Sequence, residues 1–230
     1  METLPITSIE EYEQTQIKRS RIKFNFCKVS LTDTIRWKNV IEKDLNKKIL
    51  DSKICCLGTR SGKEVDLFRI AFSYNHILHI VLYIISSSKI LEKIFIKYFL
   101  KIGRKKISFK SNKYCYGVEI NPDAKRKDVL ISNFDLISSN WDNQFNIVFS
   151  NSIDQSMDPV NTSEKWKRLL KKNDHNNYLI ICFSYTKPEL TDPTGYITLE
   201  DIKALFPGEV IYYSKNISTY QEVIIKAGEN

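Results

Sequence analysis

Short apolar runs alternate with amphipathic segments along most of this chain. Each of five runs predicts a buried strand: 53–57, 114–120, 128–131, 146–150 and 178–183. The last run is almost entirely apolar, as is typical of a central strand in a parallel sheet. A final strand pair is predicted over 210–213 and 222–226. We therefore predict an α/β fold: a three-layer αβα sandwich with a Rossmann-like, mostly parallel sheet and an antiparallel last strand.

The segments before and between these strands have helical character. A helix over 8–23 would begin with Ser8 as its cap, and a second would run from a cap at Thr32 or Asp33 to about Lys48. Further helices are expected over 63–72, 162–172 and 199–205. We expect residues 1–50 to form helices that pack on the core and residues 51–230 to form the α/β domain.

Residues 73–113 are too many for a simple strand–helix–strand crossover, so they predict a helical insertion. Apolar side chains recur there at helical spacing, beside lysines at 89, 93, 97 and 101. The face over 77–100 is typical of a helix packed on the domain or in a dimer interface. Peripheral contact with an anionic membrane is the second interpretation.

Composition adds few constraints. The 230 residues are 42% hydrophobic, which suits one globular domain with a sizeable core. The net charge of +8 is spread over separate lysine-rich clusters without interleaved aromatic residues, so we expect a solvated basic surface and no nucleic-acid partner.

The cysteines and the apolar stretches bear on the compartment. The five cysteines include no CxxC pair, and we interpret them as reduced residues with no structural zinc site. Cys55 and Cys56 should point to opposite faces of one strand. The N-terminus does not have the pattern of a signal peptide, and the longest apolar stretch, 77–85, is too short to span a bilayer. We expect a cytoplasmic protein.

A glycine-containing turn at 58–62 connects the first predicted strand to a helix. Gly58 and Gly62 permit unusual backbone angles and the close approach of a ligand, and the helix start favours an anion. Strand, glycine loop and helix in this order begin a nucleotide-binding unit. A plain strand–helix turn would explain two glycines four residues apart equally well.

Polar residues follow the next strands at the edge where such folds bind ligands. Glu119 ends the second strand, and its carboxylate can accept both hydroxyl hydrogens of a ribose. After the third strand, Asn133 can bond an adenine amino group and Phe134 can pack on the ring. The segment 150–154 follows the fourth strand.

These segments, in this order, resemble the class I S-adenosylmethionine-dependent methyltransferases, most closely the type-11 group. The matching segments are 55–62, 116–122, 133–136, 141–151, 166–171 and 178–181. The resemblance implies S-adenosylmethionine as cofactor, no metal, and cofactor contacts at Leu57, Gly58, Thr59, Arg60, Gly62, Glu119, Ile120, Asn133, Phe134, Asp135 and Asn151. The chain departs from the family pattern with Cys56 at the usual acid, Arg60 at the middle glycine, and Asn133 and Asn146 at usual Asp positions.

The resemblance also implies an in-line methyl transfer to a small-molecule or glycan acceptor. Asp154 is the candidate base, with Asp158 and His175 as weaker candidates. The alternative interpretation is that Asp154 is an acidic residue of the turn near Asp158, with no catalytic role. A catalytically inactive methyltransferase-like partner protein and a nucleic-acid methyltransferase remain alternatives. A nicotinamide-dependent oxidoreductase is disfavoured because 58–62 lacks GxGxxG spacing.

Overall fold

The computed structural model describes residues 1–6, 8–49, 52–72, 94, 114–215 and 220–228. The expected insertion at 73–113, with its apolar face at 77–100, therefore lies outside the described residues apart from residue 94. No helix in the described part is long and apolar enough to cross a membrane.

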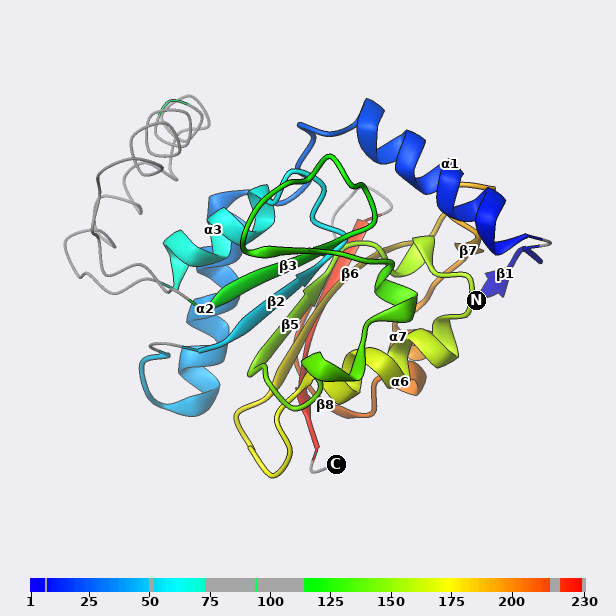
Figure 1. Cartoon of the computed structure of the whole chain (residues 1–230). Helices are drawn as coiled ribbons and strands as arrows, with labels where there is room; N and C mark the ends of the chain where they lie inside the picture. Colours follow the sequence, from blue (N-terminus) through cyan, green and yellow to red (C-terminus); the bar gives the residue numbers. More distant parts are fainter. Residues whose placement is uncertain (7, 50–51, 73–93, 95–113, 216–219, 229–230) are drawn as a thin grey trace.

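A seven-stranded sheet forms the centre of the molecule (Figure 1). Its strands, in spatial order, are β4 (Val129–Ile131), β3 (Cys115–Glu119), β2 (Ile54–Leu57), β5 (Ile147–Ser150), β6 (Tyr178–Ser184), β9 (Tyr220–Ala227) and β8 (Gly208–Lys215). The first five are parallel, whereas β9 is antiparallel to both β6 and β8. This confirms the predicted mostly parallel sheet with an antiparallel end. The final pair is longer than predicted, because the ladder between β8 and β9 continues past the apolar residues at both ends.

Helices cover both faces of the sheet, which completes the predicted three layers. Helices α2 (Leu31–Leu45) and α3 (Lys63–Ala71) lie on one face, and α6 (Pro159–Leu169) and α7 (Leu199–Leu205) lie on the other (Figure 1). The strand β2 is buried on both sides: Cys56 packs in the cluster that contains Trp37, and Cys55 packs in the cluster that contains Trp166. The two cysteines thus face opposite layers, as their adjacency predicts. All five cysteines are free thiols.

Two predicted helix starts were wrong. Helix α2 is capped by Ser30, and Asp33 is instead the third residue of the helix, whose carboxylate bonds back to the Ser30 backbone amide. Helix α6 starts at Pro159 behind an Asp158 cap, three residues before the predicted start. In both cases the helix starts earlier than the apolar spacing indicates, behind a side chain that accepts a backbone N–H of the first turn.

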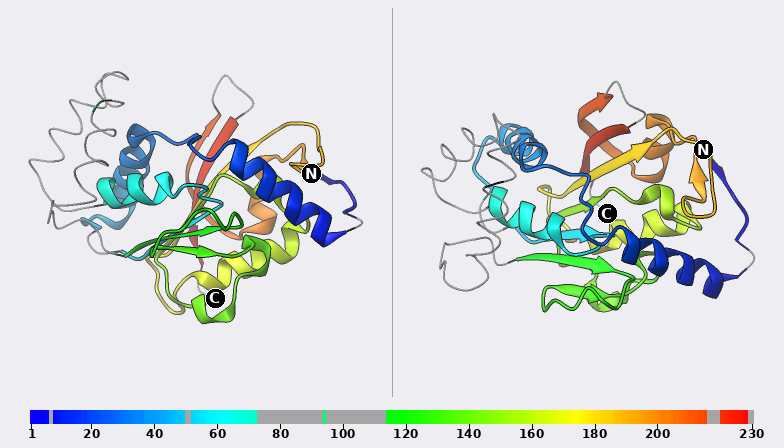
Figure 2. Two further views of the ribbon diagram at one scale, coloured as in Figure 1. Left: turned by 45° about the horizontal axis from the view of Figure 1, so that its top comes forward. Right: turned by 90° about the horizontal axis from the view of Figure 1, so that it is seen from above.

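Helix α1 (Ile9–Ile22) belongs to neither layer. It begins after Ser8, whose side chain accepts a hydrogen bond from the Glu11 amide, as predicted. Figures 1 and 2 show it lying across the molecule beyond the ends of β2 and β3. The chain before it pairs as β1 (Glu2–Thr3) with β7 (Thr194–Gly195), which ties the segment before α1 to the body of the protein.

Gly58 provides a test of the loop after β2. Its φ of 75° lies in the left-handed region, and an added Cβ would lie 2.6 Å from the Ser152 hydroxyl. We expect Gly58→Ala to lower the free energy of unfolding by about 1–3 kcal/mol, measured by urea denaturation. The matched control is Gly228→Ala, where a Cβ would meet nothing within 4 Å, and it should change stability by less than about 0.5 kcal/mol. Equal effects would contradict this account.

Candidate functional site

The site lies at the carboxyl edge of the parallel strands. From β2 the sheet extends through β3 and β4 on one side and through β5 and β6 on the other. The loops after β2 and its neighbours therefore diverge, leaving a crevice at the edge. The predicted ligand-binding segments all follow strands of this sheet, so the topology places them at its carboxyl edge.

The loop after β2 has the backbone of a glycine loop although only its ends are glycine. Gly58 and Gly62 have φ values of 75° and 76°, and Arg60 between them has a φ of 50°. A non-glycine residue in this region is strained. The strained conformation is held because the Arg60 amide donates to Glu119 Oε2 at 2.5 Å. Arg60 therefore has the left-handed backbone that suits a glycine, and its guanidinium lies 5.4 Å over the ring of Phe26.

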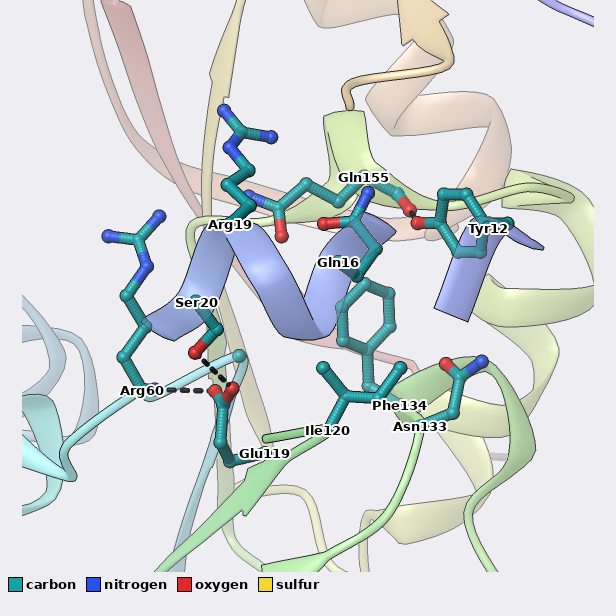
Figure 3. Close-up of a pocket in the computed structure, with 11 residues that line it drawn as sticks. Tyr12, Gln16, Arg19, Ser20, Arg60, Glu119, Ile120, Asn133, Phe134 and Gln155 are labelled. Atoms are coloured by element: carbon teal, nitrogen blue, oxygen red, sulfur yellow. Dashed lines mark hydrogen bonds between the residues drawn. The ribbon is translucent and has the colours of Figure 1, made fainter. Parts of the chain in front are cut away.

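Glu119 is the central polar group of the crevice. It ends β3 and is only 3% exposed. Besides the Arg60 amide, its carboxylate accepts the Ser20 hydroxyl at 2.7 Å (Figure 3). It also accepts the Asn121 backbone amide at 3.1 Å. Three donors thus compensate for the loss of water around this carboxylate.

An apolar wall with one amide adjoins Glu119. Ile120 and Phe134 line the crevice together with Asn133 (Figure 3). The side-chain oxygen of Asn133 accepts the backbone N–H of Asp135, and its side-chain NH₂ group donates to the Glu13 carboxylate of α1 at 3.0 Å. The apolar side chains of this wall have the chemistry to contact one face of a flat ring, and the amide supplies a polar group at its edge.

Helix α1 contributes residues to the crevice that the sequence pattern did not predict. Tyr12, Gln16, Arg19 and Ser20 line the crevice from above the sheet (Figure 3). The remaining free space is about 20 Å³, which is room for about one water. A signal for this placement was present, because these residues recur at helical spacing and give α1 a polar inner face, but no local pattern indicates what such a face contacts.

The structure gathers some predicted site residues and separates others. The crevice is lined by Gly58, Arg60, Glu119, Ile120, Asn133 and Phe134. Other predicted residues lie outside this lining. Leu57 is buried in the core, and Gly62 is the N-cap of α3. The Thr59 side chain is directed toward Gly117 of β3. The Asp135 carboxylate accepts the Thr162 hydroxyl at 2.5 Å, so it faces α6, and Asn151 bonds to the Ser152 hydroxyl.

Asp154 lies in a 3₁₀ turn, η3 (Ile153–Gln155), after β5. The Ser184 hydroxyl donates to its Oδ2 at 3.3 Å, while its Oδ1 is shielded from solvent without a hydrogen-bond partner among the described residues. Burial, reinforced by the negative charge of Asp192, raises the pKa of Asp154 to about 7, against the opposing charges of Lys28 and Arg19.

The weaker candidates for the base are not brought to this position. Asp158 accepts the Asn161 amide as the cap of α6. His175 precedes β6 and so lies at the amino edge of the sheet, opposite the crevice. The described residues contain no group of three or more His, Cys, Asp or Glu side chains that could hold a metal ion.

The strand order and the two helical layers give this chain the Rossmann-like fold of the class I S-adenosylmethionine-dependent methyltransferases. A 1,6-didemethyltoxoflavin-N1-methyltransferase from Burkholderia thailandensis, solved with bound 1,6-didemethyltoxoflavin and S-adenosylhomocysteine, is similar with a TM-score of 0.54 and 10% identity, over 98% of this chain and 93% of that one. The CurJ carbon methyltransferase is similar with a TM-score of 0.50 and 10% identity, over 85% of this chain and 54% of that one. No family model and no curated protein matches the sequence.

The pKa of Asp154 predicts how this residue affects stability. Because the folded pKa of about 7 exceeds the ordinary value of 3.8, protonation stabilises the fold fully below 3.8, and this contribution is lost as the pH rises through 7. We expect the stability of Asp154→Asn relative to wild type to increase between pH 5 and pH 8.5, measured by urea denaturation.

The comparison with wild type is needed because burial also raises the pKa of Glu64 to about 7. That contribution is common to both proteins and cancels in the difference. Asp123→Asn, at an exposed carboxylate paired with Arg21, is the control and should show the same difference at both pH values. A stability difference between Asp154→Asn and wild type that is the same at both pH values would contradict the raised pKa of Asp154.

Proposed function

We propose that this chain is an S-adenosylmethionine-dependent methyltransferase that acts on a small-molecule or sugar acceptor. The observation that carries the proposal is Glu119, a buried carboxylate at the end of β3 that accepts a hydroxyl hydrogen bond inside the crevice. A ribose hydroxyl would make the same interaction. The B. thailandensis enzyme with the same fold was solved with S-adenosylhomocysteine, which supports this choice of cofactor.

The residues of the crevice fit this cofactor in their chemistry. Glu119 would accept the ribose hydroxyls, and the apolar side chains of Ile120 and Phe134 would flank the adenine. Gly58 permits close approach of the ligand to the loop backbone. Arg60 at the same loop supplies a cation for the methionine carboxylate. When bound, S-adenosylmethionine supplies an electrophilic methyl group on a sulfonium.

Asp154 is our candidate for the catalytic base. Its Oδ1 is shielded from solvent and is available to accept a proton from an acceptor hydroxyl or amine. Ser184 fixes the other oxygen of the carboxylate. A pKa of about 7 leaves a substantial fraction ionised at neutral pH, and the ionised form is strong enough as a base to be useful. Asn151 of the same loop would complete the wall near the methyl group.

A small acceptor is favoured over a nucleic acid by the pairing of the arginines. Arg19, Arg36, Arg69 and Arg126 each form ion pairs within the protein. Such side chains are held by carboxylates and are less available to neutralise phosphates. The similar enzyme from B. thailandensis was solved with a small molecule. We expect the chain to act in the cytoplasm.

Calorimetric titration with S-adenosylmethionine and S-adenosylhomocysteine tests the proposal. We expect wild type to bind in the micromolar range and Glu119→Gln to bind at least about tenfold more weakly, because the amide retains the shape but loses a charged acceptor, at a cost of about 1.4 kcal/mol or more. Glu164→Gln, at an exposed residue on α6, is the control and should bind like wild type. If folded wild type does not bind either compound, the proposal is overturned and an inactive partner protein is favoured.

A further inference from the structure

Helix α1 makes polar contacts with groups that the proposed cofactor site would use. Its Ser20 hydroxyl is bonded to Glu119, and its Glu13 carboxylate is bonded to Asn133. One helix thus engages both the predicted ribose acceptor and the predicted adenine partner.

The position of α1 leaves too little space for a nucleoside. The free volume beneath it is about 20 Å³, whereas sites for such ligands enclose roughly 300 Å³ or more. Gln16 lies next to the ring of Phe134, and Tyr12 lines the same crevice beside Gln155 (Figure 3). Side chains of α1 therefore occupy the place that the cofactor would need.

A second set of contacts holds the helix down on the acceptor side of the site. Arg19 forms a two-pronged ion pair with Asp192 and also donates to the Thr191 carbonyl. Gln16 donates to the same carbonyl at 2.7 Å, and the Tyr12 hydroxyl donates to the carbonyl of Gln155, next to Asp154. The Arg19 and Asp192 side chains are each less than one-fifth exposed, so solvent screens their pairing only partly.

We propose that α1 is an autoinhibitory strap: it occupies the cofactor site in the free protein, and S-adenosylmethionine must displace it to bind. This inference rests on the proposed function. Because Tyr12 and Arg19 contact the loops around Asp154 and Asp192, displacement of α1 also opens the acceptor side of the site. Loading of the cofactor and access of the acceptor are thereby coupled through one helix.

Hydrogen exchange of wild type, with and without saturating S-adenosylmethionine, distinguishes displacement from closure. Displacement predicts faster exchange of the α1 amides at 12–22 together with slower exchange in the loop at 58–62. Slower exchange in both segments would mean that α1 closes over the cofactor as a lid, and it would overturn the inference. The measurement uses wild type alone and does not depend on the folding of a variant.

A pair of substitutions on α1 gives a second test. Arg19→Ala removes the ion pair that holds the strap, so the open form becomes more populated and the apparent Kd for S-adenosylmethionine should fall by on the order of tenfold. Arg21→Ala removes the same charge from the same helix but breaks only an exposed pair with Asp123, so its Kd should stay within about twofold of wild type.

The outcomes separate this inference from the proposed function. Tighter binding by Arg19→Ala, with binding by Arg21→Ala like that of wild type, supports the strap. Equal binding by wild type and both variants overturns the strap and leaves the methyltransferase proposal in place. If no protein binds the cofactor, including folded Arg19→Ala, the proposed function fails and the inference fails with it.

Discussion

The buried carboxylate of Glu119 is the constraint on which the rest of the site depends. A carboxylate that is removed from water needs hydrogen-bond donors close to it. Here they come from the Arg60 amide, the Asn121 amide and the Ser20 hydroxyl. The first of these donors fixes the loop after β2 in a left-handed turn, and the last fixes the position of α1. Strain at Arg60 is thus offset by the charge that its amide stabilises.

A network of ion pairs also stabilises the loop after β2, on the side of α3. Arg126, in the segment between β3 and β4, pairs with Asp66 of α3 and with Asp128, and Arg69 also pairs with Asp128. The Arg126 guanidinium also donates to the Gly62 carbonyl at 3.2 Å. This network connects α3 and the end of the glycine loop to the segment that precedes β4. The loop after β2 is thus held in place on the strand side of the crevice, and α1 covers the opposite side.

Most of the fold could be predicted because its signals are local. The strand β6 was evident as an apolar run, and helix α7 was predicted at its observed bounds. The start of α2 was placed too late, because its Ser30 cap and the Asp33 amide act together through geometry that apolar spacing does not encode. Glu119 and Gly58 were identified because strand ends in such a sheet meet at one edge.

By itself, the sequence determined the alternation of strands and helices, the two-sided burial of β2 and the set of polar residues at the carboxyl edge, since each follows from the spacing of side chains along one segment. Tertiary structure alone decided where Ser20 and Arg19 lie, because their partners, Glu119 and Asp192, are 99 and 173 residues away in the chain. It also turned Asp135 toward Thr162 and away from the crevice. Such pairings depend on which buried charge finds which donor once the layers are packed, and no local pattern contains that information.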